Sequence, residues 1–217
     1  MNDESMKWQP MPVDKSITEP LEPLVKGWVD QVRAELPGIP DTVTWEWDNN
    51  QLMEDYGCGG ATVTPSLLHL SFAPEFADKA LQMQALEATI KHEMFHIAQG
   101  WAMFESKYTN ATDMVSQAIM EGAACVYERE TTGRPVDYAM PLVGENPDAM
   151  FAMLQTLPKE LSWDDWRKYK FYDPESGRKW IVYKAGVWFI DQVLAKNPNL
   201  KIQDLAHMTP QEILALT

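Results

Sequence analysis

Two of the chain's four histidines stand four residues apart in the segment "ATIKHEMFHIAQGW", residues 88–101. They are His92 and His96, and Glu93 directly follows the first of them. Residues four apart in a helix project from one face, one turn apart, so both imidazoles can reach a single zinc ion. A glutamate beside the first histidine is displaced around the helix, where it can contact a zinc-bound water without ligating the metal. The pattern predicts a zinc site with Glu93 as its general base; the alternative is a helix with two neighbouring histidines and no metal.

A catalytic zinc needs a third protein ligand, and the segment "SQAIMEGAACVYERE", residues 116–130, offers Glu121. Apolar and small residues flank this glutamate, which argues against an ordinary solvated position. A buried carboxylate without a partner is costly, whereas one bound to zinc is compensated. The glycine and alanines after Glu121 would let its helix approach the first helix closely. We therefore expect one Zn²⁺ per chain on His92, His96 and Glu121, with Glu128, two turns further along the same face, as the alternative third ligand.

Together these segments resemble the gluzincin clan of zinc metallopeptidases, which includes thermolysin-like enzymes and zinc aminopeptidases. The resemblance rests on "HEMFH" (92–96), then "MEGAA" (120–124), and later "YKAG" (183–186). It implies a compact zincin-like fold. It also implies that the hydroxyl of Tyr183 stabilises the oxyanion of the tetrahedral intermediate, as the tyrosine of a Tyr-x-x-Gly motif does in that clan. Thermolysin-like enzymes carry an aspartate four residues after the third ligand to orient a zinc histidine. Cys125 stands there in this chain, so another carboxylate or carbonyl must orient the histidine.

The function that follows is zinc-dependent hydrolysis of a peptide or protein substrate. Zinc would polarise the scissile carbonyl, while Glu93 would take a proton from the bound water and pass it to the leaving amine. Two alternatives stay open: a binding or regulatory protein that keeps the zincin fold without turnover, and a zinc hydrolase of a non-peptide amide. The substrate and the choice between endopeptidase and exopeptidase activity are also open.

The composition limits the classes of partner and the compartment that we expect for the protein. The 217 residues include 32 acidic and 18 basic residues, a net charge of −14, which argues against nucleic acid as a partner. No run of 18 apolar residues is present, so we expect no membrane span. The N-terminal "MNDESMKWQPMPVDKS" lacks the basic and apolar regions of a secretory signal, which favours a cytoplasmic protein. In that compartment Cys58 and Cys125 are expected to be reduced.

The order of elements predicts an α+β protein with a single catalytic domain, residues 1–217. We expect an irregular arm over residues 1–20, an N-terminal α/β lobe over 21–110 and a helical lobe over 111–217. Apolar periodicity, strand-type alternation and capping residues predict helices at 24–35, 76–102, 113–131, 147–156, 162–170, 178–196 and 210–216, and strands at 42–47, 61–64 and 67–72.

Several residues receive structural interpretations. "LLHLSF" (67–72) is expected to be an edge strand able to pair with an extended peptide, with His69 on the surface or in a cleft. "DNNQLMEDYGCGG" (48–60) is expected to be a loop, so Cys58 is not expected to be a nucleophile. His207, just before a helix start, is assigned a structural role.

Overall fold

The structure is a computed structural model that describes residues 13–104 and 113–217. The fold is α+β, as the sequence predicts: a small sheet in the N-terminal half and helices in both halves. In chain order the described elements are α1 (Lys15–Thr18), η1 (Glu19–Leu21), α2 (Glu22–Glu35), β1 (Thr44–Trp47), η2 (Asn49–Gln51), β2 (Cys58–Thr64), β3 (Leu67–Phe72), α3 (Lys79–Gln99), α4 (Met114–Thr132), η3 (Asp137–Ala139), α5 (Pro147–Thr156), α6 (Trp163–Lys170), α7 (Ile181–Lys196), α8 (Ile202–Leu205) and α9 (Pro210–Leu214).

The sheet has the order β1-β3-β2, with β1 parallel and β2 antiparallel to β3. The expectation that "LLHLSF" is an edge strand is therefore wrong, because β3 has hydrogen-bonded neighbours on both sides. Five of its six residues are also buried, as in a strand that is covered on both faces. The glutamate Glu22 joins α2 to β1, since its carboxylate accepts the indole N–H of both Trp45 and Trp47 at 2.8 Å.

Two expected loop regions contain regular structure. The strand β2 begins at Cys58 rather than at Ala61, because Cys58 pairs with Phe72 at the far end of β3. Residues 15–20, expected in an irregular arm, form α1 and most of η1; Asp14 caps α1 by accepting a hydrogen bond from the Ser16 backbone N–H. Residues 1–12 of that arm lie outside the described residues.

The helix α3 packs against α2, β2 and α4. Its apolar residues Leu86, Ile90 and Met94, spaced four residues apart, are fully buried. It is shorter than expected at both ends, because its bounds are set by caps. Asp78 accepts from the backbone N–H of Leu81 at the start, and Gly100 adopts the left-handed conformation (φ 71°) at the end.

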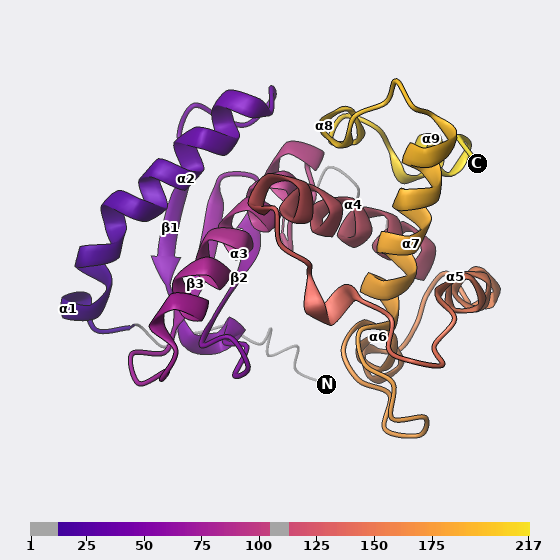
Figure 1. Cartoon of the computed structure of the whole chain (residues 1–217), viewed down its shortest axis with the longest axis horizontal. Helices are drawn as coiled ribbons and strands as arrows, with labels where there is room; N and C mark the ends of the chain where they lie inside the picture. The colour runs from indigo at the N-terminus through magenta and orange to yellow at the C-terminus, as the bar shows by residue number, and fades with distance from the viewer. Residues whose placement is uncertain (1–12, 105–112) are drawn as a thin grey trace, which may run out of the picture.

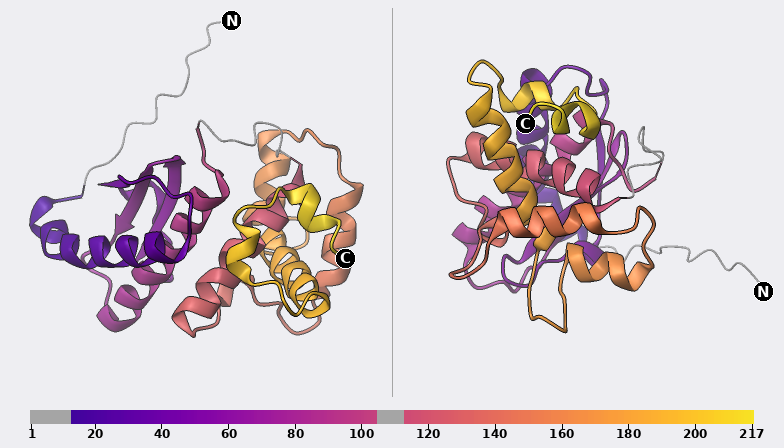
Figure 2. Two further views of the ribbon diagram at one scale, coloured as in Figure 1. Left: turned by 90° about the horizontal axis from the view of Figure 1, so that it is seen from above. Right: turned by 90° about the vertical axis from the view of Figure 1, so that its right-hand side faces the viewer.

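Figure 1 shows α1 to α3 and the sheet in one half of the molecule and α4 to α9 in the other. The views in Figure 2 agree, and they place α7 beside α4. Across the junction of the two halves, the rings of Phe95 and Tyr127 stack with centroids 4.9 Å apart, and the hydroxyl of Tyr127 donates to Glu35 at 2.8 Å. The two halves therefore share one continuous core.

The helices α4 and α7 approach each other at glycines. A Cβ atom on Gly122 would lie 2.2 Å from the carbonyl carbon of Gly186, and one on Gly186 would lie 2.0 Å from the carbonyl oxygen of Ala118. The expectation that the small residue after Glu121 serves the approach to α3 is thus wrong for Gly122. It joins the "MEGAA" and "YKAG" segments to each other instead.

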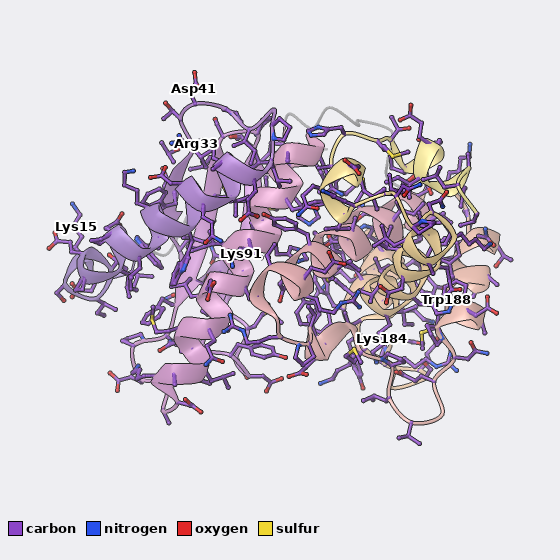
Figure 3. All side chains as sticks on the ribbon, turned by 45° about the horizontal axis from the view of Figure 1, so that its top comes forward. Lys15, Arg33, Asp41, Lys91, Lys184 and Trp188 are labelled. Atoms are coloured by element: carbon purple, nitrogen blue, oxygen red, sulfur yellow. The ribbon has the colours of Figure 1, made fainter. Side chains whose placement is uncertain are left out.

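Buried lysines have ion-pair partners in this fold. Lys91, labelled in Figure 3, donates to Glu87 at 2.8 Å and to the backbone carbonyl of Thr131 at 3.1 Å. Lys184, also labelled there, donates to Glu145 at 2.7 Å. The contact of Lys91 with Glu87 joins neighbouring turns of α3, whereas the other two contacts link segments that are far apart in the sequence. No helix among residues 13–104 and 113–217 is long and apolar enough to cross a lipid bilayer.

Candidate metal centre

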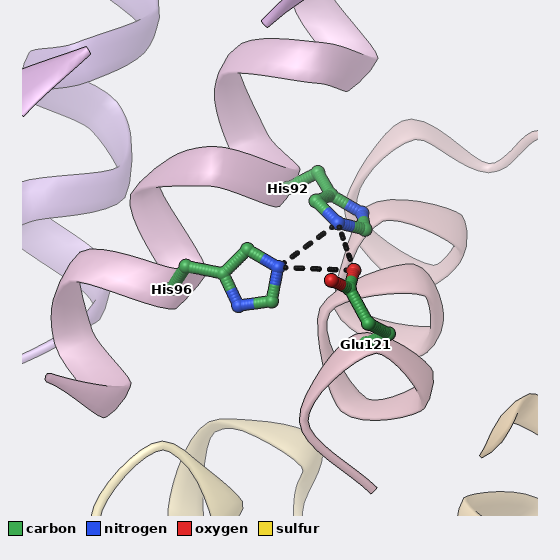
Figure 4. A group of neighbouring side chains, drawn as sticks. All are labelled: His92, His96 and Glu121. Carbon is green, nitrogen blue, oxygen red and sulfur yellow. Dashed lines mark hydrogen bonds and ion pairs between the residues drawn. The ribbon is translucent and has the colours of Figure 1, made fainter. Parts of the chain in front are cut away.

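The side chains of His92, His96 and Glu121 converge where α3 meets α4 (Figure 4). The Nε2 atom of each histidine lies 3.2 Å from Oε2 of Glu121, and the two Nε2 atoms lie 3.1 Å apart. All three side chains are buried. The structure thus brings together three potential ligand atoms, one from each residue, in a single buried triangle.

The size of this triangle fits a metal ion. With zinc–nitrogen bonds of about 2.0–2.1 Å, two ligand atoms of a tetrahedral ion lie roughly 3.3 Å apart. The three observed separations are close to that value. Two imidazole nitrogens and one carboxylate oxygen are also a donor set that zinc takes, with a fourth position left for water. The buried His/Glu group can therefore hold a metal ion.

Each histidine is oriented by a partner at its other ring nitrogen. Nδ1 of His92 lies 3.2 Å from Oε2 of Glu128, and Nδ1 of His96 lies 2.8 Å from Oε1 of Gln99. Gln99 in turn donates to the backbone carbonyl of Met120, beside Glu121. Such acceptors fix the tautomer that directs Nε2 towards the metal position. Glu128, expected as an alternative third ligand, faces the outer side of His92 in the structure.

A second group of potential ligands, His92, Cys125 and Glu128, lies on that outer side. Sγ of Cys125 is 3.9 Å from Nδ1 of His92 and 3.6 Å from the hydroxyl of Tyr138, which donates to Glu128 at 3.3 Å. Burial raises the pKa of the Cys125 thiol, although His92 partly opposes this effect. Glu128 and Cys125 both contact Nδ1 of His92, the ring nitrogen that is not part of the triangle, so we interpret this group as the hydrogen-bonded support of His92.

Glu93 is the more accessible member of the "HEMFH" segment, because its side chain is half-buried while both histidines are buried. Its Oε2 atom accepts from the backbone N–H of Thr62 at 2.7 Å and from the Thr62 hydroxyl at 2.9 Å. The same hydroxyl lies 2.7 Å from the Glu93 carbonyl oxygen, so its single proton is shared between the two acceptors. The strand β2 therefore fixes the Glu93 carboxylate, and no hydrogen bond with a described residue involves its other oxygen, Oε1.

Lys170 contacts the triangle, which the sequence did not indicate. Lys170 is the last residue of α6. Its ammonium donates to Oε1 of Glu121 at 2.7 Å, and this is the carboxylate oxygen that does not contact the histidines. Burial favours the neutral form of Glu121, but Lys170 and the two histidines outweigh burial and hold its pKa well below the usual range. Glu121 is therefore ionised, as a metal ligand must be.

Tyr183 lies in the first turn of α7, in an aromatic group around this site. Its ring is 5.4 Å from that of Tyr138 and 5.5 Å from that of Trp180, centroid to centroid. Burial raises its pKa well above the usual value, and the charges of Glu121 and Glu93 raise it further. Tyr183 is thus a neutral phenol in the electrostatic field of both carboxylates, and can act as a hydrogen-bond donor.

The remaining candidates lie away from the triangle. His69 is buried rather than exposed: its Nδ1 is 3.1 Å from Oδ2 of the fully buried Asp48, so the expected surface or cleft position is wrong. His207 is exposed, with its ring 3.6 Å from the Cβ position of Gly38. Cys58 is free and buried, and burial raises its pKa to about 12, which disfavours a nucleophilic role.

Comparisons of the chain with protein-family models, curated proteins and solved structures gave no match.

Proposed function

We propose that the protein is a zinc-dependent peptidase of gluzincin type with a zincin-like fold. The observation that carries the proposal is the buried triangle of His92 Nε2, His96 Nε2 and Glu121 Oε2 with sides of 3.1–3.2 Å. Zinc is favoured because the donors are two imidazoles and one carboxylate, whereas magnesium and calcium prefer oxygen ligands alone. One ion per chain is expected.

The bound zinc would act as a Lewis acid and lower the pKa of a water molecule. Glu93 would accept the proton of that water on Oε1, since Oε2 is held by Thr62. The half-buried position of Glu93 allows water and substrate to reach it. Glu93 would then pass the proton to the leaving amine, and the phenol of Tyr183 would donate a hydrogen bond to the oxyanion.

The test combines metal analysis with one substitution. Protein purified without chelator and reloaded with zinc is expected to hold about one zinc per chain by elemental mass spectrometry. It is also expected to cleave members of a broad peptide library. Glu93→Gln should keep the zinc and lose turnover by a factor of about 10² or more, because a general base contributes roughly 10²–10⁴. Glu130→Gln, an exposed change on α4, is the matched control and should leave both properties unchanged.

The outcomes separate the alternatives. Absence of zinc after reloading would refute the metal centre. Zinc without cleavage of any peptide would favour a binding protein, and cleavage of small amides but not of peptides would favour a non-peptide amidase. Equal turnover of Glu93→Gln and wild type on a confirmed substrate would remove Glu93 from the mechanism.

A further inference from the structure

The ammonium of Lys170 has a fixed position beside the candidate metal ligands. It is held by Oε1 of Glu121 at 2.7 Å and lies over the ring of Trp166, 4.9 Å from the centroid, and that of Tyr183 at 6.0 Å. Cation–π contacts of this kind hold a lysine without using its hydrogen-bond donors. The position of the charge therefore depends on two aromatic rings as well as on Glu121.

This ammonium keeps unused hydrogen-bonding capacity. An ammonium has three N–H donors, and among the described residues Lys170 makes one hydrogen bond, to Glu121. Its side chain retains 13% exposure, whereas that of Glu121 retains 4%. A further acceptor can thus approach Lys170 from the solvent side, although Glu121 itself is enclosed.

A cation at this position is electrostatically unfavourable beside a divalent metal ion unless a negative charge lies near both. Glu121 is the one described carboxylate in contact with Lys170, and in the proposed site it is also a metal ligand. A bound anion would compensate the remaining positive charge in a low-dielectric site, where such interactions are strong. Lys168, two residues earlier, differs in this respect because it pairs with Glu175 at 2.6 Å, away from the triangle.

Next to Lys170, the chain forms an aromatic rim that is open to solvent. Phe171, Tyr172, Lys179 and Trp180 line a shallow cavity. Trp180 adopts a left-handed backbone conformation (φ 59°), which is strained for a bulky side chain, and its ring packs on Phe171 and Tyr183. Strain of this kind often occurs at functional positions. The rim offers a substrate an apolar surface next to the end of α6, the helix that carries Lys170.

We propose that Lys170 is a substrate-binding residue that contacts an anionic oxygen of the substrate beside the metal ligands. The inference rests on the proposed function and adds a recognition element to it. Two sources supply such an oxygen: a carboxylate already present in the substrate, and the oxyanion that forms from the scissile carbonyl during the reaction.

The experiment measures anion binding without catalysis. Zinc-loaded wild type, Lys170→Met, Lys170→Arg and Lys168→Met, each verified to hold one zinc, are titrated by calorimetry with inorganic phosphate and separately with imidazole, a neutral zinc ligand. Lys170→Met should bind phosphate about tenfold more weakly or worse, the loss typical of one charge-assisted hydrogen bond. Lys170→Arg should retain most of the affinity, Lys168→Met should match wild type, and imidazole should bind all four proteins equally.

Equal phosphate affinity in wild type and Lys170→Met would overturn the proposal. Equal weakening of phosphate and imidazole would overturn it too, because Lys170 would then act only through Glu121 and the metal. If wild type holds no zinc, the proposed function fails and this inference fails with it.

The source of the anionic oxygen is identified by measuring KM and kcat on peptides with a free and with an amidated C-terminus. If the substrate carboxylate is the partner, amidation and Lys170→Met should each raise KM, and the two effects should not add. If the oxyanion is the partner, Lys170→Met should lower kcat equally for both peptides.

Discussion

At the scale of single residues, the site depends on the two ring nitrogens of one imidazole, that of His92. His92 directs Nε2 to the triangle and Nδ1 to Glu128, so its tautomer is set by the carboxylate on the far side. The thermolysin-like pattern places this carboxylate four residues after the third ligand, where this chain has Cys125. The structure puts the acceptor one turn later, at Glu128, which is seven residues after Glu121 and therefore on the same face of α4.

Glu128→Gln tests this arrangement. The amide retains an oxygen acceptor but loses the negative charge that orients His92 and raises its basicity. Zinc affinity should fall by about 10–100-fold, while one zinc per chain is still reached at high zinc concentration. Competition with a chromophoric chelator measures both quantities, with Glu130→Gln as the exposed control on the same helix. Loss of stoichiometric zinc in Glu128→Gln but not in Glu121→Gln would instead make Glu128 the third ligand.

At the scale of elements, caps and close contacts determine where the site residues lie. Asp113 caps α4 by accepting from the backbone N–H of Ser116, as Asp78 does for α3, and left-handed glycines end both helices. The helix α4 then lies between α3, which carries the histidines, and α7, which carries Tyr183. Its position against α7 depends on the contact of Gly122 with Gly186.

Gly122→Ala is expected to be strongly destabilising. Its Cβ would lie 2.2 Å from a backbone carbon of α7, so the helices must separate, and the free energy of unfolding should fall by about 3 kcal/mol. The matched control is Gly27→Ala in α2, where nothing lies within 4 Å; it should gain up to about 1 kcal/mol from helix propensity. Urea denaturation measures both. Similar unfolding free energies for the two variants would show that the α4–α7 contact is less tight than the structure indicates.

The elements were largely predictable because their signals are local. Periodicity and caps gave α2, α3, α4, α5 and α7 to within a few residues, and alternation gave β1. The order of strands in the sheet was not predictable, since hydrogen-bond pairing of β3 with both neighbours leaves no local signal. The contact of Lys170 with Glu121 also could not be foreseen, because the two residues are 49 positions apart and meet only after α5 and α6 fold back.

At the scale of the whole molecule, the candidate metal centre joins the two halves of the chain. The histidines belong to the half with the sheet, and Glu121 belongs to the helical half (Figure 1). Other contacts also cross this junction: Lys91 with the Thr131 carbonyl, and Arg134 with Glu87 at 3.1 Å. A metal ion bound by ligands from both halves would add a further link that the unfolded chain cannot form.

Metal removal should therefore lower the stability of the entire fold in one transition. A ligand that binds the native state alone stabilises it by about 4 kcal/mol when its free concentration is 1,000 times Kd. For a chain of this size the thermal midpoint should then fall on the order of 10 °C when zinc is removed by a chelator, and should recover on zinc addition. Differential scanning calorimetry measures the shift, with His96→Ala as the control in which zinc should have little effect. Magnesium, which prefers oxygen ligands in octahedral geometry, should not replace zinc.

An unchanged midpoint in the zinc-loaded and chelated wild-type protein would contradict a metal ion held between α3 and α4. A zinc shift of equal size in His96→Ala would place the binding elsewhere.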